Sequence, residues 1–297
     1  MFEKSINNPF VSQQSAVPND QELVKDILAG QRTALNQLIE RHQPYIYNIA
    51  WKMLGNHDDA ADLSQEVLIK ILANLAKFNF ESSFRTWAYR ILRNHFLNDQ
   101  KKKARAIATN FQALGEALDA VPNVELTATE KEEKQAAISE VRMTCLSGML
   151  LCLTKEQRLI FIIGEMFGAD HNIGSEIMEI SKANYRMKLS KARKDLINFM
   201  QQKCGLVDKA NPCRCHKKVT LSLESGLINA KELLHNGKAY SSFRQQLKTD
   251  ANYLVEDSEV KYMEWHRGNS YRTHFEKKNF LLQLLQDAEW KNRLNLN

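Results

Sequence analysis

Apolar residues recur every three or four positions along most of the chain, the spacing that places side chains on one face of an α-helix. Runs that alternate apolar and polar residues between turns, as strands do, are hard to find. Pro and Gly, which interrupt helices, number only 5 and 11 among 297 residues. The pattern predicts an all-α protein.

The first periodic stretch predicts a bundle of helices. One helix begins after Pro18, with Asn19 or Asp20 as its cap, because these side chains accept hydrogen bonds from free backbone N–H groups. A second ends at Pro44, since proline has no N–H to donate inside a helix. A third ends at Gly55, which tolerates the left-handed conformation of a helix C-terminus.

Two longer helices complete this bundle. Asp58 is predicted to cap the first of them, and the second runs from Phe84 to about Gln100. Further along, Thr154 and Gln157 have the spacing of a capping box, which starts another helix. A short helix and a longer one after Gly168 give this later region a helix-turn-helix plan.

The periodicity divides the chain into six predicted segments. They are a flexible N-terminal tail, a first helical domain, an acidic linker with some helix, a helix-turn-helix domain, a Cys/His cluster and a helical C-terminal extension. In chain order their bounds are 1–19, 20–105, 106–136, 137–203, 204–218 and 219–297.

Net charge and apolar content narrow the class of protein. The net charge of +6 is only mildly basic, so local clusters must carry any argument about nucleic acid. No apolar run approaches the roughly 20 residues that cross a bilayer, and no secretion signal opens the chain. We therefore expect a cytoplasmic protein that does not insert into membranes.

Aromatic and basic residues gather in residues 80–105. From Arg85 to Arg105 there are seven cations against the single carboxylate of Asp99. Basic groups neutralise phosphates, and aromatic rings stack on unpaired bases, so the composition suits single-stranded DNA. The alternative is that the apolar members are core residues at helical spacing, which is the interpretation we adopt for three of them: Phe84, Ile91 and Leu92.

A polar stripe precedes this region. Three- and four-residue steps align five side chains on one helix face: Asp58, Asp62, Gln65, Glu66 and Ile69. Such a stripe is usually no more than a solvated surface.

Two blocks in order and spacing make the pattern specific: residues 58–70 read DDAADLSQEVLIK, and residues 80–94 contain FESSFRTW followed by RILRN. They resemble the second conserved region of extracytoplasmic-function (ECF) sigma factors of the sigma-70 family. The resemblance implies docking of the acidic helix on the beta-prime clamp of bacterial core RNA polymerase through Asp62, Gln65 and Glu66. It also implies capture of the minus-ten promoter element by a second set: Phe80, Ser82, Ser83, Arg85, Trp87, Arg90, Arg93, Asn94 and Lys101.

Residues 180–193, ISKANYRMKLSKAR, are similar to the fourth region of the same family, which binds the beta flap of the polymerase and reads the minus-thirty-five element. Gly174, Glu179 and Met187 depart from the family pattern. The resemblance implies DNA contacts by Lys182, Asn184, Tyr185, Arg186, Lys188, Lys191 and Arg193.

The remaining candidate site is a run of thiols and an imidazole: Cys204, Cys213, Cys215 and His216. These are ligand types that zinc prefers, but adjacent Cys215 and His216 do not fit a standard finger. A structural zinc, a redox-sensitive thiol set and ordinary cysteines remain open. Cys145 and Cys152 are expected on the apolar face of a helix.

The sequence predicts a sigma factor that requires no cofactor, binds promoter DNA and core RNA polymerase, and has an anti-sigma factor as a further candidate partner. The alternative is a helix-turn-helix regulator that acts without polymerase. An enzyme, such as a metal-dependent nuclease or a thiol oxidoreductase, is disfavoured because no phosphate-binding glycine loop or paired nucleophile and base is found. The C-terminal extension is expected to be regulatory or a packing element.

Overall fold

The computed structural model describes residues 18–98 and 110–231. Within these ranges the secondary structure is helical, apart from an isolated bridge between Cys204 and Cys213. This confirms the predicted all-α class. The predicted N-terminal tail, apart from residues 18 and 19, and residues 232–297 of the predicted extension lie outside the described residues. None of the described helices is both long and apolar enough to span a bilayer.

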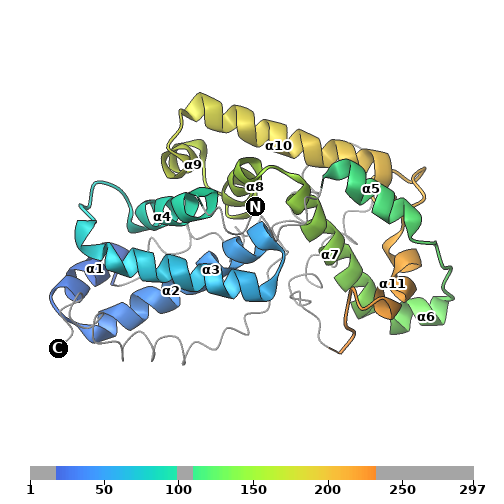
Figure 1. Ribbon diagram of the computed structural model, residues 1–297, viewed down its shortest axis with the longest axis horizontal. Coiled ribbons are helices and arrows are strands. Elements are labelled where there is room, and N and C mark those ends of the chain that lie inside the picture. Colours follow the sequence, from blue (N-terminus) through green and yellow to red (C-terminus); the bar gives the residue numbers. More distant parts are fainter. Residues whose placement is uncertain (1–17, 99–109, 232–297) are drawn as a thin grey trace, which may run out of the picture. The chain divides into compact units, whose positions relative to one another are not determined.

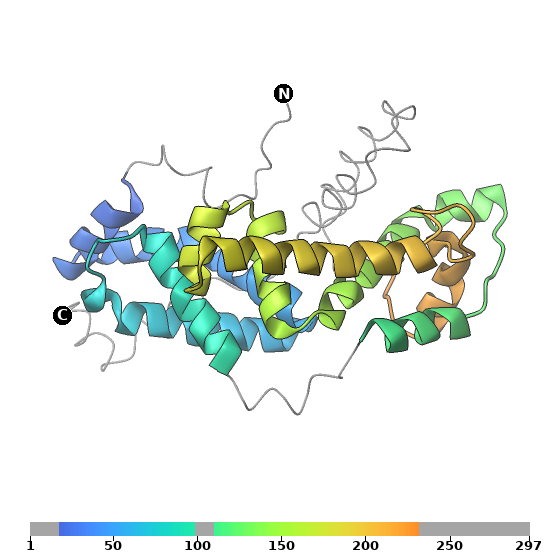
Figure 2. The same ribbon diagram turned by 90° about the horizontal axis from the view of Figure 1, so that it is seen from above.

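The chain forms two compact units, and the described part of the first contains residues 18–98 and 162–187. In it, α2 and α3 lie side by side, α1 packs on α2, and α4 contacts both α3 and α9 (Figures 1 and 2). Its elements are α1 (Asp20–Leu28), α2 (Arg32–Leu54), α3 (His57–Ala73), the 3-10 turn η1 (Leu75–Lys77), α4 (Phe84–Asn98), the π-helical turn η3 (Ile162–Met166) and α9 (His171–Met178).

The predicted break at Pro44 was wrong, because α2, which is 23 residues long, continues through Pro44 to Leu54. Proline removes one backbone donor, but the residues on either side of it are held in the core: Ile39 and Ile46 are almost fully buried. The side chain of Asn48 donates to the Pro44 carbonyl at 2.8 Å. Burial of the flanking apolar residues therefore outweighs the cost of an interior proline, about 3 kcal/mol.

The helix caps partly follow the sequence. Asn19 caps α1 and forms a reciprocal capping box with Glu22. Gly55 ends α2 in the left-handed conformation, with φ 69°. The cap of α3 is Asn56, whose side chain accepts from Asp59 N at 3.0 Å. The prediction of Asp58 as the cap was wrong by two residues, because Asp58 already lies in the first turn and faces solvent.

The described part of the second unit contains residues 110–161 and 188–231. In it α11 packs against α7 (Figure 1) around a small core of Leu126, Ala137, Val141, Val219 and Ile228. Its elements are α5 (Phe111–Ala120), α6 (Ala128–Glu133), α7 (Gln135–Cys152), α8 (Lys155–Phe161), α11 (Cys215–Glu224) and the later part of α10 (Lys182–Lys203), a helix that contributes residues to both units.

The predicted linker, 106–136, contains α5 and α6 and is tied to the later chain. The Phe111 and Phe199 rings are 5.2 Å apart, and Lys203 pairs with Asp119 at 2.5 Å. Buried Lys218 donates to the Leu118 carbonyl at 3.0 Å, near the C-terminal end of α5 where carbonyl groups lack helical partners. These contacts make the segment a packed part of the second unit.

Candidate functional site

The polar face of α3 is the first part of the site. Asp62 and Glu66 are exposed and Gln65 is half-buried, while Leu63 and Val67 on the opposite face are in the core. The 3.6-residue repeat of the helix produces this separation. The structure therefore brings together the three side chains that the sequence predicted for one face.

Glu66 also belongs to a chain of polar contacts between α3 and α4. Its Oε2 is 2.7 Å from His95 Nε2, and His95 Nδ1 is 2.5 Å from Lys70 Nζ. Because the lysine ammonium can only donate, His95 accepts at Nδ1 and donates from Nε2 to Glu66. Sequence reasoning missed His95, which lies two residues after Arg93 and has no spacing signal of its own.

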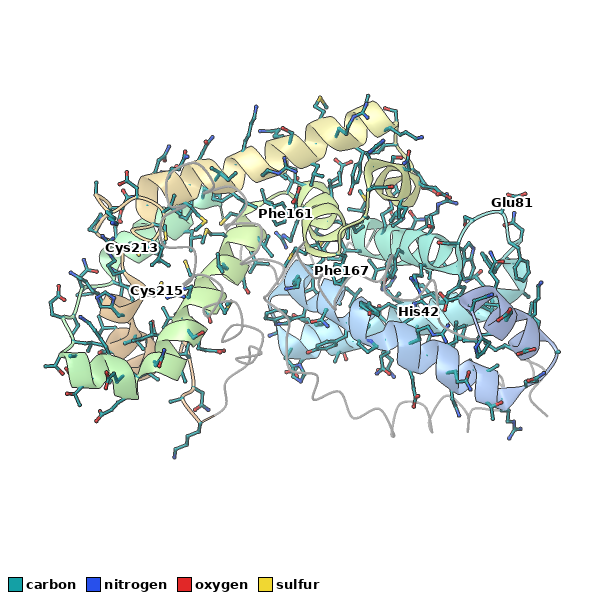
Figure 3. All side chains as sticks on the ribbon, turned by 180° about the vertical axis from the view of Figure 1, so that it is seen from behind. His42, Glu81, Phe161, Phe167, Cys213 and Cys215 are labelled. Atoms are coloured by element: carbon teal, nitrogen blue, oxygen red, sulfur yellow. The ribbon has the colours of Figure 1, made fainter. Side chains whose placement is uncertain are left out.

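The loop before α4 carries a cluster of aromatic rings. The Phe78 ring centroid lies 4.7 Å from that of Phe80 and 5.4 Å from that of Trp87. Phe78 is buried, but Phe80 and Trp87 are half-buried, so part of each ring is accessible. Phe80 adopts φ 62°, a left-handed conformation that is costly for a bulky residue and that is found mainly at functional positions. Exposed Glu81 lies in the same loop (Figure 3).

Ser83 has a structural role in this loop. Its Oγ accepts from Thr86 N at 3.1 Å, the geometry of an N-cap at the start of α4. Ser82 is half-buried, and its Oγ donates to the Ser83 carbonyl at 3.4 Å. The two serines therefore fix how the aromatic loop joins α4.

Arg85 corrects the sequence prediction. Only 10% of its side chain is exposed, and its Nε lies 3.2 Å from Asp20. Asp20 also pairs with Arg41 at 2.8 Å, and its Oδ2 is 3.2 Å from His42 Nε2. Arg85 thus joins α4 to α1 inside the bundle and is withdrawn from the DNA-contacting set.

The pKa of Asp20 reflects this environment. Burial opposes ionisation, but the hydrogen bond and charge of His42 and the guanidinium groups of Arg41 and Arg85 outweigh it and hold the pKa well below its usual value. His42 is buried at the same point (Figure 3), and burial lowers its pKa despite the neighbouring carboxylate. Asp20 is consequently the carboxylate shared by Arg41 and Arg85 inside this bundle.

The next two predicted cations of α4 face α9. Arg90 Nη2 pairs with Glu176 Oε1 at 2.8 Å and Arg90 Nε donates to the Glu176 carbonyl at 2.9 Å. Arg93 pairs with Glu179 and also donates to Asn94 Oδ1 at 2.8 Å. The four charged side chains are partly exposed, so the contact is an ion-pair seam at the surface of the first unit. Lys101 lies outside the described residues.

The helix-turn-helix has an unusual turn. Asp170 caps α9 by accepting from Asn172 N and Ile173 N at 2.8 Å each. Glu179 then adopts the left-handed conformation, φ 52° and ψ 45°, that glycine usually supplies. The unexpected Gly174 is explained by Tyr185, since a Cβ at residue 174 would lie 2.1 Å from Tyr185 Cζ.

Tyr185 itself is fully buried, so its prediction as a DNA contact was wrong. Of the predicted residues at the start of α10, Lys182 and Arg186 are exposed and Asn184 is half-buried. Met187, which the sequence marked only as a departure, is 64% exposed beside them. The helical pattern alone could not predict the exposure of Met187. That exposure depends on which face of α10 packs against the rest of the fold.

The later predicted cations of α10 have acidic neighbours. Lys188 Nζ pairs with Glu156 Oε2 at 2.5 Å, and Lys191 Nζ lies 3.3 Å from Asp195 Oδ2 one turn along α10. Arg193 is half-buried. Of the seven residues predicted on this helix, Lys182 and Arg186 are therefore the exposed cations that form no ion pair with a described residue.

The Cys/His cluster is compact. Cys204 and Cys213 bridge backbone to backbone, and Cys215 follows as the first residue of α11 (Figure 3). All five cysteines are unpaired thiols. Within residues 18–98 and 110–231, no three His, Cys, Asp or Glu side chains are already arranged to hold a metal ion.

Residues 38–106 match the model of Sigma-70 region 2, a stretch that includes α3, the aromatic loop and α4. The chain is 31% identical over 80 residues to the ECF RNA polymerase sigma factor SigW of Bacillus subtilis, which is 27% of this chain and 43% of SigW. It is 27% identical over 191 residues to the ECF RNA polymerase sigma-E factor of Escherichia coli, 61% of this chain and 94% of that protein.

A solved structure of the sigma factor RpoE in complex with the anti-sigma factor NepR from Bartonella quintana aligns with 56% of this chain and 96% of that chain, with 21% identity and a TM-score of 0.40. That superposition is too loose to transfer any contact. The match to SigW spans less than half of SigW. The predicted resemblance to ECF sigma factors is nevertheless confirmed, and residues 38–106 match Sigma-70 region 2.

Proposed function

We propose that this protein is a sigma factor, which directs core RNA polymerase to promoters and assists strand opening without catalysing a reaction itself. The observation that carries the proposal is the Sigma-70 region 2 match over residues 38–106, which contains both an exposed acidic helix face and an aromatic loop followed by a basic helix. A repressor or activator that never meets polymerase would need neither feature, and this alternative is not favoured.

In this proposal the α3 face docks on the beta-prime clamp. Asp62, Gln65 and Glu66 offer two carboxylates and an amide toward solvent, the groups that pair with basic and amide side chains of a partner. The hydrogen bond between Glu66 and His95 holds that carboxylate on the surface and limits the rotamer entropy lost on docking.

The minus-ten contacts are assigned to the aromatic loop and to α4. Phe80 and Trp87 offer partly accessible rings for unstacked bases, and Arg90, Arg93 and Asn94 offer phosphate and base contacts. Stacking of about 1–3 kcal/mol per base offsets the cost of unpairing, so strand opening needs no hydrolysis. Because Arg90 and Arg93 are engaged by Glu176 and Glu179, their use on DNA requires those ion pairs to open.

The minus-thirty-five contacts are assigned to the start of α10. Lys182 and Arg186 are exposed cations and Asn184 is an amide on the same helix, a set that suits phosphates and base edges in the major groove. Met187 adds an exposed apolar group, which suits the methyl group of thymine. Lys188, Lys191 and Arg193 remain candidates for phosphate contacts farther along the helix.

The remaining partners stay predictions. The beta flap is the expected contact of the helix-turn-helix, and an anti-sigma factor is expected to compete with polymerase for these surfaces. The Sigma-70 region 2 match supports a protein that acts by binding and not by catalysis. We predict that promoter recognition requires no cofactor. This prediction does not concern the cysteine cluster.

Run-off transcription with purified bacterial core polymerase tests the proposal. The wild-type protein is compared with a triple variant, Asp62→Ala, Gln65→Ala and Glu66→Ala, on a library of promoter-length DNA. A matched control replaces two carboxylates and one amide that are exposed elsewhere, Glu132, Glu133 and Gln135. We expect specific transcripts from wild type and control, and their loss in the α3 variant. DNA binding without transcripts and without core association would identify a polymerase-independent regulator.

A further inference from the structure

Four cysteines from α7 and from the segment that joins α10 to α11 lie in the second unit. Cys145 lies on α7, Cys204 directly follows α10, Cys213 precedes α11 by two residues and Cys215 is the first residue of α11. Cys215 packs on the core that contains Val141, which lies one helical turn before Cys145 on α7. Burial, together with the neighbouring thiols of Cys215, Cys204, Cys213 and Cys152, raises the pKa of Cys145 well above its usual value. The sequence cluster was predicted without Cys145, which is 59 residues away from Cys204 in the chain.

The loop between α10 and α11 is built to hold two of these thiols side by side. Gly205 N donates to the Cys213 carbonyl at 3.0 Å, which closes the bridge between Cys204 and Cys213. Asn211 Nδ2 donates to the Gln201 carbonyl at 2.7 Å and so ties the loop back to α10. Arg214 folds over Gly205, where any Cβ would collide with its guanidinium.

The turn after α10 holds the backbone of Cys204. Val207 N donates to the Cys204 carbonyl at 3.1 Å, and Asp208 N donates to the same oxygen at 3.0 Å. Burial raises the pKa of the Cys204 thiol, and burial likewise raises the pKa of Cys213. Lys218 and Arg214 are the cations near Cys213.

His216 does not belong to this group. Its charged neighbours are Lys131, Glu125, Lys217 and Arg214, and it lines a pocket with Gln135 and Arg142. Successive side chains of an α-helix point in different directions, so Cys215 and His216 have different surroundings. Cys145 replaces His216 as the fourth candidate ligand.

We propose that Cys145, Cys204, Cys213 and Cys215 form a four-thiolate site for a structural Zn²⁺ ion that fastens the α10–α11 loop to α7. Zinc prefers a tetrahedral set of four thiolates in closed structural sites, with Zn–S distances of about 2.3 Å. Binding converts four thiols to thiolates, releases four protons and leaves a net charge of −2 on the site. Lys218 and Arg214 offset that charge.

Ligation requires the sulfurs to move toward one point, since the described side chains are not already arranged around one. A cysteine sulfur moves by rotation about χ1 alone, so the backbone bridge and the helices can stay in place. Without a metal, neighbouring thiols stay protonated, because several thiolates side by side repel one another. Zn²⁺ reverses this preference for the protonated form, because it binds only the thiolate.

The first test measures zinc by plasma mass spectrometry in the full-length protein purified with reductant and zinc. We expect about one zinc per chain in wild type, and at least about tenfold less in Cys145→Ser and Cys213→Ser, since each removes a direct ligand. Cys152→Ser is the matched control on the same helix, because that thiol donates to the Gly148 carbonyl at 3.5 Å. His216→Ala is the second control, and both should retain wild-type zinc.

Cobalt substitution of the wild-type protein gives a readout that does not depend on a variant that folds poorly. Four thiolates produce intense sulfur-to-cobalt charge-transfer bands, and zinc should displace the cobalt and remove them. Wild-type protein that contains reduced thiols but binds neither metal would overturn the proposal. So would loss of zinc in His216→Ala with retention in Cys145→Ser, or a Cys204–Cys213 disulfide as the stable form under these conditions.

Discussion

The ring of Tyr185 lies directly against Gly174, where a Cβ would be 2.1 Å from Cζ and 2.4 Å from the hydroxyl oxygen of the tyrosine. Glycine inside a helix costs up to about 1 kcal/mol relative to alanine. Here that cost is offset by the close packing of Tyr185, a fully buried residue of α10, against Gly174 on α9. The two unusual features of this helix-turn-helix, its glycine and its buried tyrosine, are therefore one packing arrangement.

Gly174→Ala should destabilise the protein although alanine favours helix. Overpacking costs about 1–3 kcal/mol, which exceeds the gain in propensity, and urea unfolding of the full chain would measure the loss. Tyr185→Leu removes the ring, so the double variant should lose less than the sum of the two single variants. Additive losses would show that the two residues are not coupled.

Asp20→Asn should destabilise the first bundle by about 3 kcal/mol near pH 7, since it leaves the guanidinium groups of Arg41 and Arg85 without their shared carboxylate. The pKa of Asp20 is lowered on folding, so its stabilisation is present above the unfolded pKa near 4 and is lost as pH falls through the folded pKa. Chemical unfolding at pH 7, pH 5 and pH 2 measures both effects.

The variant should therefore lose less stability than wild type between pH 5 and pH 2. Asp26→Asn is the control on the same helix, where the carboxylate lies 3.4 Å from the Gln31 amide. If Asp20→Asn and Asp26→Asn had equal effects at pH 7, the buried charge cluster would not be a source of stability.

Removing the acidic partners of α4 should expose its arginines to DNA. We expect the double variant Glu176→Gln and Glu179→Gln to bind a single-stranded minus-ten oligonucleotide more tightly. Partly exposed ion pairs contribute about 0–1 kcal/mol, so the gain should not exceed about fivefold for each pair. Fluorescence anisotropy at fixed salt measures it.

The matched control for that measurement is Glu125→Gln, which removes the partner of Lys217 in the second unit. It changes the net charge by one but leaves Arg90 and Arg93 paired. An equal gain per charge in the control would attribute the effect to overall charge and not to the α4 seam.

Met187→Ala should change sequence preference more than affinity. If its side chain contacts a thymine methyl, the variant loses discrimination at one base pair of the minus-thirty-five element, by up to about 1 kcal/mol. Arg186→Ala should weaken binding more strongly and reduce its salt dependence if it contacts phosphate. Binding to duplexes substituted at each position separates the two; unchanged preference in Met187→Ala would exclude the methyl contact.

Local chemistry was predictable from the sequence where neighbours in the chain decide it. Asn19 with Glu22 and Thr154 with Gln157 form the expected capping interactions, at 3.0 Å and 3.3 Å from cap oxygen to backbone nitrogen. The 3.6-residue repeat of α3 also separates Leu63 and Val67, which lie in the core, from the predicted polar residues Asp62 and Glu66, which are exposed. Helical periodicity and capping act over three or four residues, so a linear pattern contains them.

Contacts between distant segments required the folded chain. The sequence determined an all-helical protein, its polar α3 face and its Sigma-70 region 2 motifs. Only the tertiary structure buried Arg85 against Asp20, seated Tyr185 on Gly174, carried α2 through Pro44 and brought Cys145 to the later cysteines. The type of a basic, aromatic or thiol residue does not tell whether it lies on a solvated face, in a core or in a binding site. Packing against residues that are distant in the sequence determines which of these it is.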